Sequence, residues 1–162
     1  MTDAVETGFS DIHAVVARVP DPEIPVVSIV ELGMLREIRR AADGAREVVL
    51  SPTYTGCPAT DAIKRDVERA LSDAGMDDVR VRYQLTPPWT TDWISEAGRE
   101  KLRRYGIAPP RGSRGGTVPE DIPCPHCGTA AGELVSEFGS TPCKAAMRCR
   151  SCREPFDYFK CL

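Results

Sequence analysis

Two pairs of cysteines near the C-terminus constrain this chain more than any other feature. Cys124-Pro-His-Cys127 and Cys149-Arg-Ser-Cys152 are both Cys-x-x-Cys pairs, and 21 residues separate them. Two intervening residues let both thiolates of a pair reach one ion from a tight turn, and two such turns supply the four soft ligands of a closed tetrahedral site. The spacing therefore predicts a zinc ribbon, in which bound zinc supplies most of the folding free energy of a module with a small core.

The other cysteines leave more than one interpretation open. Six of the seven cysteines lie between residues 124 and 161, and an odd number without an export signal argues against a disulfide framework. Cys-Pro-His-Cys also occurs in thiol oxidoreductases, where it follows a strand of a thioredoxin-like fold, but here a second pair matches it. Cys143 and Cys161 are either reduced residues packed beside the ribbon or candidate thiols for iron or a cluster.

Composition excludes two classes of function. The chain of 162 residues has no apolar run near the roughly 20 residues of a membrane span. Its acidic N-terminus lacks the order of a signal peptide, so we expect a cytoplasmic protein. The net charge is −3, and residues 106–162 carry seven basic against six acidic residues. That balance lacks the basic footprint of a nucleic-acid binder.

The pattern of apolar residues and turns predicts an α+β fold. A stretch rich in Pro and Gly, 106–121, is typical of a linker between a domain at 1–105 and a zinc-ribbon module at 122–162. In the first domain we expect a small mixed-sheet α/β sandwich with helices on one face and a third strand parallel to its partner. The expected helices are 9–19, 59–74 and 92–105, and the expected strands are 34–40, 46–51 and 79–85.

Cys57 is the candidate functional thiol of the first domain. Pro58 suits the first position of a helix, which would put Cys57 at the helix N-terminus, where the dipole lowers the pKa of a thiol. The alternative is a small structural cysteine between strand and helix. Asp21, in Asp-Pro-Glu-Ile-Pro, is predicted to cap a short helical segment beginning at Pro22.

Taken together, these motifs resemble a known family. The order Asp-Pro-Glu-Ile-Pro, Val-Ser-Ile-Val-Glu-Leu-Gly, Thr-Gly-Cys-Pro and Pro-Pro-Trp is similar to the SufT-like domain of iron–sulfur assembly factors. With the ending Cys-Arg-Ser-Cys-Arg-Glu-Pro-Phe-Asp-Tyr-Phe-Lys-Cys, the chain from about residue 10 resembles the PaaD family, also called PaaJ. Members of this family accompany the multicomponent phenylacetyl-CoA epoxidase of aerobic phenylacetate degradation.

The resemblance implies a role in maturing a metal centre rather than in turnover. Cys57 matches the family's Gly-Cys-Pro cysteine, and Asp21 matches its acidic Asp-Pro position. Glu31 stands where many relatives have Asp, so the two are candidate supporting carboxylates. The implied cofactor is zinc, with a transient iron–sulfur cluster or iron as cargo.

The resemblance also implies partners. We expect the oxygenase and reductase of the epoxidase and the iron–sulfur assembly machinery, but no nucleic acid and no membrane; a homodimer is compatible with the sequence. The alternative function is a structural or regulatory subunit that uses the ribbon for docking. We expect no enzymatic activity of its own, because neither His13 nor His126 can be placed beside a nucleophile.

Overall fold

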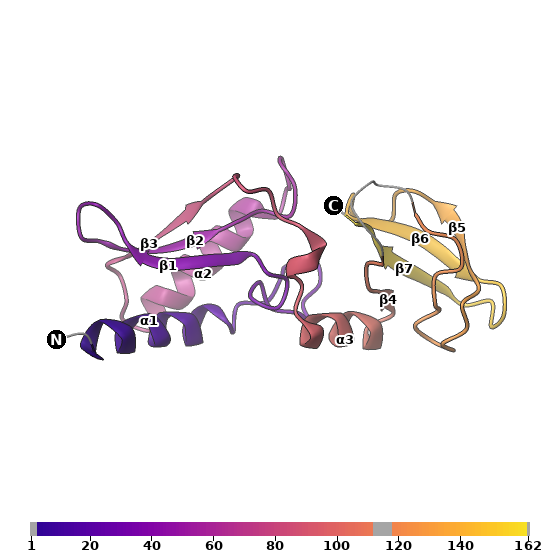
Figure 1. Ribbon diagram of the computed structural model, residues 1–162, viewed down its shortest axis with the longest axis horizontal. Coiled ribbons are helices and arrows are strands. Elements are labelled where there is room, and N and C mark those ends of the chain that lie inside the picture. Colours follow the sequence, from indigo (N-terminus) through magenta and orange to yellow (C-terminus); the bar gives the residue numbers. More distant parts are fainter. Residues whose placement is uncertain (1–2, 112–117, 162) are drawn as a thin grey trace. The chain divides into compact units, whose positions relative to one another are not determined.

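The computed structural model describes residues 3–111 and 118–161. Its contacts divide the chain into two compact units, one ending at Trp89 and the other beginning at Thr90. None of the helices in these ranges has the length and apolar character needed to cross a bilayer. Each unit has its own sheet (Figure 1), so the two are described separately.

The first unit is a three-stranded sheet with two helices. Strands β1 (Leu35–Arg40), β2 (Arg46–Leu50) and β3 (Val79–Tyr83) lie in that order, with β1 antiparallel and β3 parallel to β2. Helix α1 (Asp3–Val16) contacts β1, α2 (Thr60–Asp73) contacts β3, and the helices contact each other (Figure 1). The mixed sheet and the parallel third strand are confirmed.

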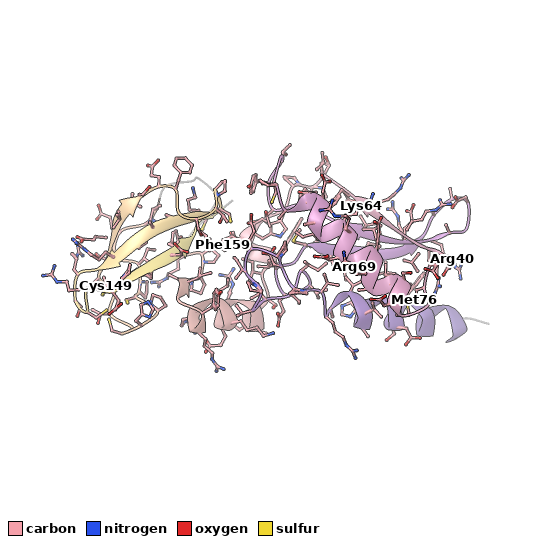
Figure 2. All side chains as sticks on the ribbon, turned by 180° about the vertical axis from the view of Figure 1, so that it is seen from behind. Arg40, Lys64, Arg69, Met76, Cys149 and Phe159 are labelled. Atoms are coloured by element: carbon pink, nitrogen blue, oxygen red, sulfur yellow. The ribbon has the colours of Figure 1, made fainter. Side chains whose placement is uncertain are left out.

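The core of this unit follows the periodicity of the sequence. One face of α2 buries Ile63, Val67 and Leu71, while charged residues occupy its other side. Figure 2 shows Lys64 and Arg69 projecting from α2; they form ion pairs with Glu68 at 3.9 Å and Asp66 at 3.1 Å. Burying the apolar face of α2 removes these three side chains from water, which stabilises the fold. The core side chains that are at most 1% exposed include Ile12, Val16, Ile29, Leu32, Met34, Val48, Val49, Leu50, Ile63, Val67 and Leu71.

A buried carboxylate lies in the middle of the sheet. Glu47 on β2 is only 3% exposed and receives ion pairs from Arg39 on β1 at 3.4 Å and Arg82 on β3 at 3.3 Å. The register sets Arg39 directly opposite Glu47, and a buried charge needs such partners to offset its lost hydration. This triad therefore ties all three strands together through their side chains.

The second unit carries the ribbon. After a short 3-10 turn, Thr91–Trp93, helix α3 (Glu96–Arg104) leads into β4 (Ile107–Ala108). The strands β5 (Gly132–Ser136), β6 (Lys144–Cys149) and β7 (Pro155–Phe159) complete a sheet of order β4-β7-β6-β5. Its core includes Ile122, Met147, Phe156 and Tyr158. The tail aromatics Phe156, Tyr158 and Phe159 are at most 5% exposed, as expected for the apolar core of the module.

The division between the units differs from the predicted boundary after residue 105. Arg99 on α3 donates to the carbonyls of Thr91 at 2.8 Å and Pro110 at 3.0 Å, and Leu102 is fully buried. Ile107, inside the predicted linker 106–121, pairs with Asp157 of β7. These contacts hold α3 and the start of the predicted linker in the second unit. Residues 112–117 of that linker lie outside the described residues.

Two helix predictions also differ from the structure. The helix predicted over 9–19 runs from Asp3 to Val16, and the chain turns through residues 17–19 instead. The helix predicted over 92–105 is interrupted at Ile94, which is extended, and restarts when the Ser95 hydroxyl accepts the Gly98 N–H at 3.0 Å. An N-cap side chain satisfies one of the free N–H groups of the first turn, so the cap begins α3.

The Ser95 cap can be tested locally. Replacing Ser95 by Ala removes the acceptor, and an N-cap Ser is worth about 1 kcal/mol, so amide exchange in the first turn of α3 should accelerate about five-fold. Hydrogen exchange followed by NMR measures this directly. The matched variant Ser95→Asp keeps an acceptor and should leave the rates near those of the original chain; equal acceleration in both variants would contradict the capping role.

Candidate metal centre

Each cysteine pair lies on a tight turn of the same construction. In the first, the Gly128 N–H donates to the Cys124 carbonyl at 2.8 Å, and in the second the Arg153 N–H donates to the Cys149 carbonyl at 3.0 Å. The residue after each pair takes a positive φ, 76° at Gly128 and 70° at Arg153. The left-handed conformation turns the chain sharply enough for both sulfurs of a pair to face the same point. The two turns are therefore matching knuckles, one closed by glycine and the other by arginine.

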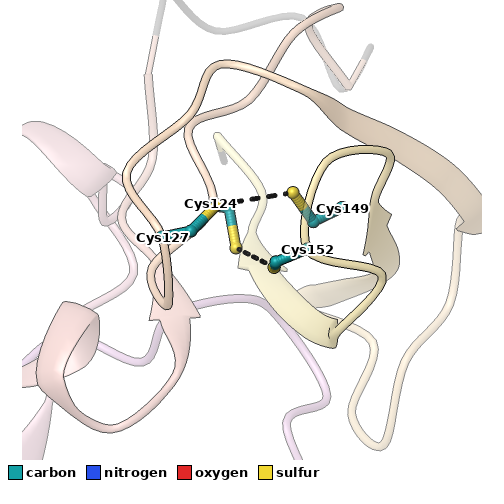
Figure 3. Close-up of side chains that lie close together, drawn as sticks. All are labelled: Cys124, Cys127, Cys149 and Cys152. Carbon is teal, nitrogen blue, oxygen red and sulfur yellow. Dashed lines mark hydrogen bonds between the residues drawn. The ribbon is translucent and has the colours of Figure 1, made fainter.

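The knuckles bring four sulfur atoms together. The sulfurs of Cys124, Cys127, Cys149 and Cys152 all lie within 4.8 Å of one another, and Figure 3 shows them facing a common centre. Cys124 Sγ is 3.7 Å from Cys152 Sγ, and Cys127 Sγ is 3.7 Å from Cys149 Sγ. Zinc with Zn–S bonds of about 2.3 Å needs tetrahedral sulfurs about 3.8 Å apart. The donor set and its spacing thus fit zinc, which in a closed four-thiolate site contributes folding energy and no open position for a substrate.

The surroundings of the sulfurs shift their proton affinities in opposite directions. Burial raises the pKa of the Cys124 thiol. Hydrogen bonds from the side chain and backbone of Thr129 lower the pKa of Cys127 to about 6. The Glu154 backbone lowers the pKa of Cys152, but desolvation and the neighbouring thiols outweigh it and raise that pKa to about 12. Four adjacent thiols cannot all ionise at neutral pH unless a cation balances them, which is what a bound divalent metal does.

His126 is a knuckle residue in the structure, as expected from its position. Its side chain is exposed, and its Nε2 lies 3.2 Å from the Pro155 carbonyl. Its backbone N–H donates to Cys124 Sγ at 3.4 Å, a contact that favours the thiolate form. His126 thus supports a candidate ligand through its backbone.

The two remaining cysteines of the module lie at the other end of the strands. The carbonyl of Cys143, just before β6, accepts the Lys160 N–H at 2.9 Å, so Cys143 and Cys161 lie where β6 begins and β7 ends. In Figure 2, the labelled Cys149 and Phe159 lie at opposite ends of these strands. Six residues of strand, at about 3.3 Å each, put Cys143 about 20 Å from Cys149. Both side chains are buried and form no disulfide among the described cysteines, and the structure does not add them to the four-sulfur group.

Cys57 lies in the first unit, in the loop between β2 and α2. The helix begins at Thr60 rather than at Pro58, so the prediction of Pro58 as the first helical residue is wrong. Pro58 and Ala59 form a turn, closed by the Thr60 N–H donating to the Cys57 carbonyl at 3.1 Å. The Cys57 side chain is partly exposed and free. It is therefore an accessible thiol one turn before the helix.

Tyr83 is the aromatic neighbour of this loop. Its hydroxyl donates to the Thr60 carbonyl at 2.7 Å, which fastens the start of α2 to the end of β3. Burial, and after it the negative charge of Cys57, Asp61 and Glu68, raises the pKa of Tyr83. The phenol consequently stays protonated and remains a donor at neutral pH.

The two candidate carboxylates have structural contacts of their own. Asp21 is 7% exposed, and its Oδ1 accepts the N–H groups of Glu23 and Ile24, both at 2.8 Å. Asp21 thus makes the hydrogen bonds of a capping carboxylate, but the helical segment predicted to begin at Pro22 is a turn. Glu31 and Ser28 form a reciprocal capping box, with the Ser28 N–H to Glu31 Oε2 at 2.9 Å and the Glu31 N–H to Ser28 Oγ at 3.1 Å. In the described ranges, neither acid forms a group of three or more close metal-ligating residues with Cys57.

A buried serine beside the Cys57 loop escaped the sequence reasoning. Ser51 is 1% exposed, and its Oγ has no hydrogen-bond partner among the described residues. It lines a cavity of about 50 Å³, together with Thr53, Thr55 and Trp89. A polar cavity of this size has room for ordered water. A single serine after a strand carries no sequence signal that could have identified it.

Comparison with known proteins accounts for both units. Residues 10–83 match the family described as iron-sulfur cluster assembly protein, and residues 108–160 match the PaaD zinc beta ribbon domain. An iron-sulfur protein maturation auxiliary factor of Porphyromonas gingivalis is 34% identical over 57% of this chain and 88% of its own length. A DUF59 domain of Bacillus anthracis superposes with a TM-score of 0.54 and 26% identity, over 60% of this chain and 92% of that one. The chain is thus an assembly-type domain joined to a zinc ribbon.

One relative covers nearly the whole length. A protein of Escherichia coli K12, named as one of the subunits of 1,2-phenylacetyl-CoA epoxidase, is 48% identical over 94% of this chain and 92% of its own length. The chain belongs to this family, the PaaD proteins. The expected resemblance, the fold class and zinc as cofactor are confirmed. The comparisons support an accessory role in iron–sulfur chemistry.

The glycine of the first knuckle allows a paired test. An added Cβ at Gly128 meets nothing within 4 Å, so Gly128→Ala carries only the backbone cost of a left-handed residue, about 1–2 kcal/mol. Because zinc binding and folding are coupled, zinc affinity should fall about ten-fold in competition with a chelator. Arg153→Gly relieves the same cost at the second knuckle and should raise affinity. Shifts of the same sign in both variants would refute this account.

Zinc affinity should also depend on pH. At pH 7 the Cys127 thiol is largely ionised, whereas Cys152, with a pKa of about 12, is protonated and must release its proton to a bound metal. Apparent affinity should therefore rise steadily from pH 6 to pH 8. Calorimetry in two buffers of different ionisation enthalpy measures the released protons; no proton release at pH 7 would contradict the thiol assignment.

Proposed function

We propose that this chain is a non-catalytic maturation factor that assembles or inserts an iron–sulfur or iron centre into components of the phenylacetyl-CoA epoxidase. One observation carries the proposal: the chain holds two thiol sites of different character. Four sulfurs gather into a closed tetrahedral site, whereas Cys57 stands alone and partly exposed in the assembly-type unit. A closed site suits structure, and an accessible thiol suits cargo that must arrive and leave.

In this proposal Cys57 is the thiol that carries the cargo. Its loop is fastened on both sides, by the Cys57 N–H to the Tyr54 carbonyl at 3.3 Å and by the Thr60 N–H to the Cys57 carbonyl. Such a loop presents the sulfur at a fixed place without burying it. Asp21 and Glu31 each accept hydrogen bonds from the backbone of their own turn, and we assign them a positioning role.

The ribbon is the structural part. We assign Cys124, Cys127, Cys149 and Cys152 as its zinc ligands, because their sulfurs have the spacing that zinc requires.

Cys143 and Cys161 remain as further candidate thiols, each buried next to a hydroxyl. Thr141 Oγ1 lies 3.0 Å from Cys143 Sγ, and Tyr158 Oη lies 3.8 Å from Cys161 Sγ. The proteins that receive the iron or cluster in this proposal are the oxygenase and reductase components, and the transfer takes place in the cytoplasm.

A second function is favoured by one comparison. The relative from Escherichia coli is named as a member of the epoxidase itself, which suggests a lasting structural or regulatory part of the complex. Mixing oxygenase and reductase that already hold their metals, with and without this chain, separates the two functions. A maturation factor is dispensable in that mixture, whereas a required structural component restores activity when it is added.

The maturation function is tested through Cys57. Oxygenase and reductase purified from cells that make the Cys57→Ala chain should contain markedly less iron and sulfide, because the carrying thiol is absent. Metal analysis and absorption spectra of each component measure the loss. Zinc in the variant chain should remain near one per molecule, since the ribbon ligands are unchanged.

The comparison variant is Cys143→Ser, which removes one of the further candidate thiols and tests whether the cargo needs it in addition to Cys57. It should leave the iron content of both components close to that obtained with the original chain. Full iron and sulfide in every component of the Cys57→Ala strain would falsify the proposed function. Equal losses in both variants would assign the role to the thiols collectively and contradict the part given to Cys57.

A further inference from the structure

A cleft of about 420 Å³ lies within the second unit, beside the first knuckle. Its walls come from α3, from the segment after β4 and from the turn that holds Cys124. Four of its ten lining residues are prolines, and Ala108 adds a fully apolar wall. The volume lies within the range of protein sites that receive a small ligand or a few side chains. All of its lining residues belong to one compact unit.

Three of the residues that line this cleft are positively charged. Arg99, Arg103 and Arg111 line it, and no acidic residue of the described ranges does so. Arg99 is held rigid by its two bonds to the carbonyls of Thr91 and Pro110, and no carboxylate in the described part of the chain pairs with it. Its guanidinium has five N–H donors, of which these bonds use two. A fixed cation with spare donors is suited to an anionic ligand.

The other two arginines add to this charge. Arg103 forms an ion pair with Glu100, but Arg104, which lies outside the cleft, shares the same carboxylate. One carboxylate thus faces two guanidinium groups. Arg111 has an exposed side chain. Its described hydrogen bonds involve only its backbone: the N–H and the carbonyl each lie 3.1 Å from the Tyr158 hydroxyl.

The lining favours a carboxylate attached to an apolar group. Phosphate sites commonly use several backbone N–H donors, and prolines have none. The chain as a whole is acidic, with a net charge of −3, which is not the basic footprint of a nucleic-acid binder. Guanidinium groups bind carboxylates through two parallel hydrogen bonds, while the prolines offer apolar surface. An acidic peptide with an apolar residue combines both features.

We propose that this cleft is the docking site for an acidic segment of a partner protein. A carboxylate of the segment binds the lining arginines, and a neighbouring apolar side chain packs against the lining prolines. The identity of the partner, an epoxidase component, rests on the proposed function. The chemistry of the site rests on the cleft alone.

The chemistry is tested with a peptide probe on the full, zinc-loaded chain. Acetyl-Glu-Phe-Glu-Leu-Glu-amide should shift the NMR signals of Ala108, Gly128 and the Arg99 guanidinium, and the peptide with Gln in place of Glu should not. Arg103→Gln and Arg111→Gln should each weaken binding about five-fold and lower its salt dependence. Arg104→Gln is the matched control: it loses the same ion-pair partner, Glu100, but lies outside the cleft.

Three results would overturn the proposal. Binding that falls equally in the Arg103 and Arg104 variants would show a diffuse charge effect. Sodium pyrophosphate that binds more tightly than the peptide, with the same dependence on the arginines, would assign the cleft to phosphate. Weaker zinc binding in the arginine variants, with unchanged peptide shifts, would mean that the arginines only balance the charge of the metal centre.

A second measurement separates this proposal from the proposed function. Arg111→Gln should weaken binding to the purified oxygenase or reductase in interferometry, whereas Cys57→Ala should bind normally and fail only to load iron. Normal binding by Arg111→Gln, combined with defective iron loading by Cys57→Ala, would contradict the docking proposal and leave the maturation role intact. The reverse pair of results would leave docking in place and remove the role of Cys57.

Discussion

Four sulfur atoms, all within 4.8 Å of one another, join two distant turns of the C-terminal unit. The first knuckle precedes β5 and the second joins β6 to β7, so a metal bound between them closes a loop of 21 residues between Cys127 and Cys149. Cys124 and Cys149 also belong to the buried core, next to Ile122 and Phe156. Metal binding and core packing are consequently coupled, because two of the four residues that would hold zinc also lie in the core. The strands, the β4 segment and the cleft beside Cys124 all depend on it.

The first unit depends on a different principle. Its apolar core is large enough to fold around α2 and the sheet, and Glu47 with its two arginines joins the three strands. This unit does not need a metal-bound cysteine to fold, whereas the ribbon does. Cys57 can therefore remain partly exposed and reduced without a cost to folding. In the proposed function, separating the structural thiols from the accessible one lets a single chain hold one metal permanently and pass another on.

Sequence periodicity predicted the elements of the first unit well, since α2, β1, β2 and β3 lie within one or two residues of their expected bounds. It failed where a single side chain redirects the backbone. The Ser95 hydroxyl starts α3 anew, and the Pro58–Ala59 turn delays α2 until Thr60. Composition also suggested a linker at 106–121, but Ile107 pairs with β7. Propensity and composition describe a segment by itself, and they miss a strand of two residues whose stability comes from its partner.

The sequence alone determined the zinc ribbon, because Cys-x-x-Cys spacing dictates which sulfurs can share an ion before any fold is known. It also determined the assembly-type domain, through the order of its motifs and the period of its apolar residues. Tertiary structure decided how far each remaining thiol lies from that ion. The register of β6 and β7 places Cys143 and Cys161 together at the start of β6 and the end of β7, away from the knuckles. It alone gathered Arg99, Arg103 and Arg111 around one cleft, since residues on a helix and on a loop meet only when the chain between them has packed.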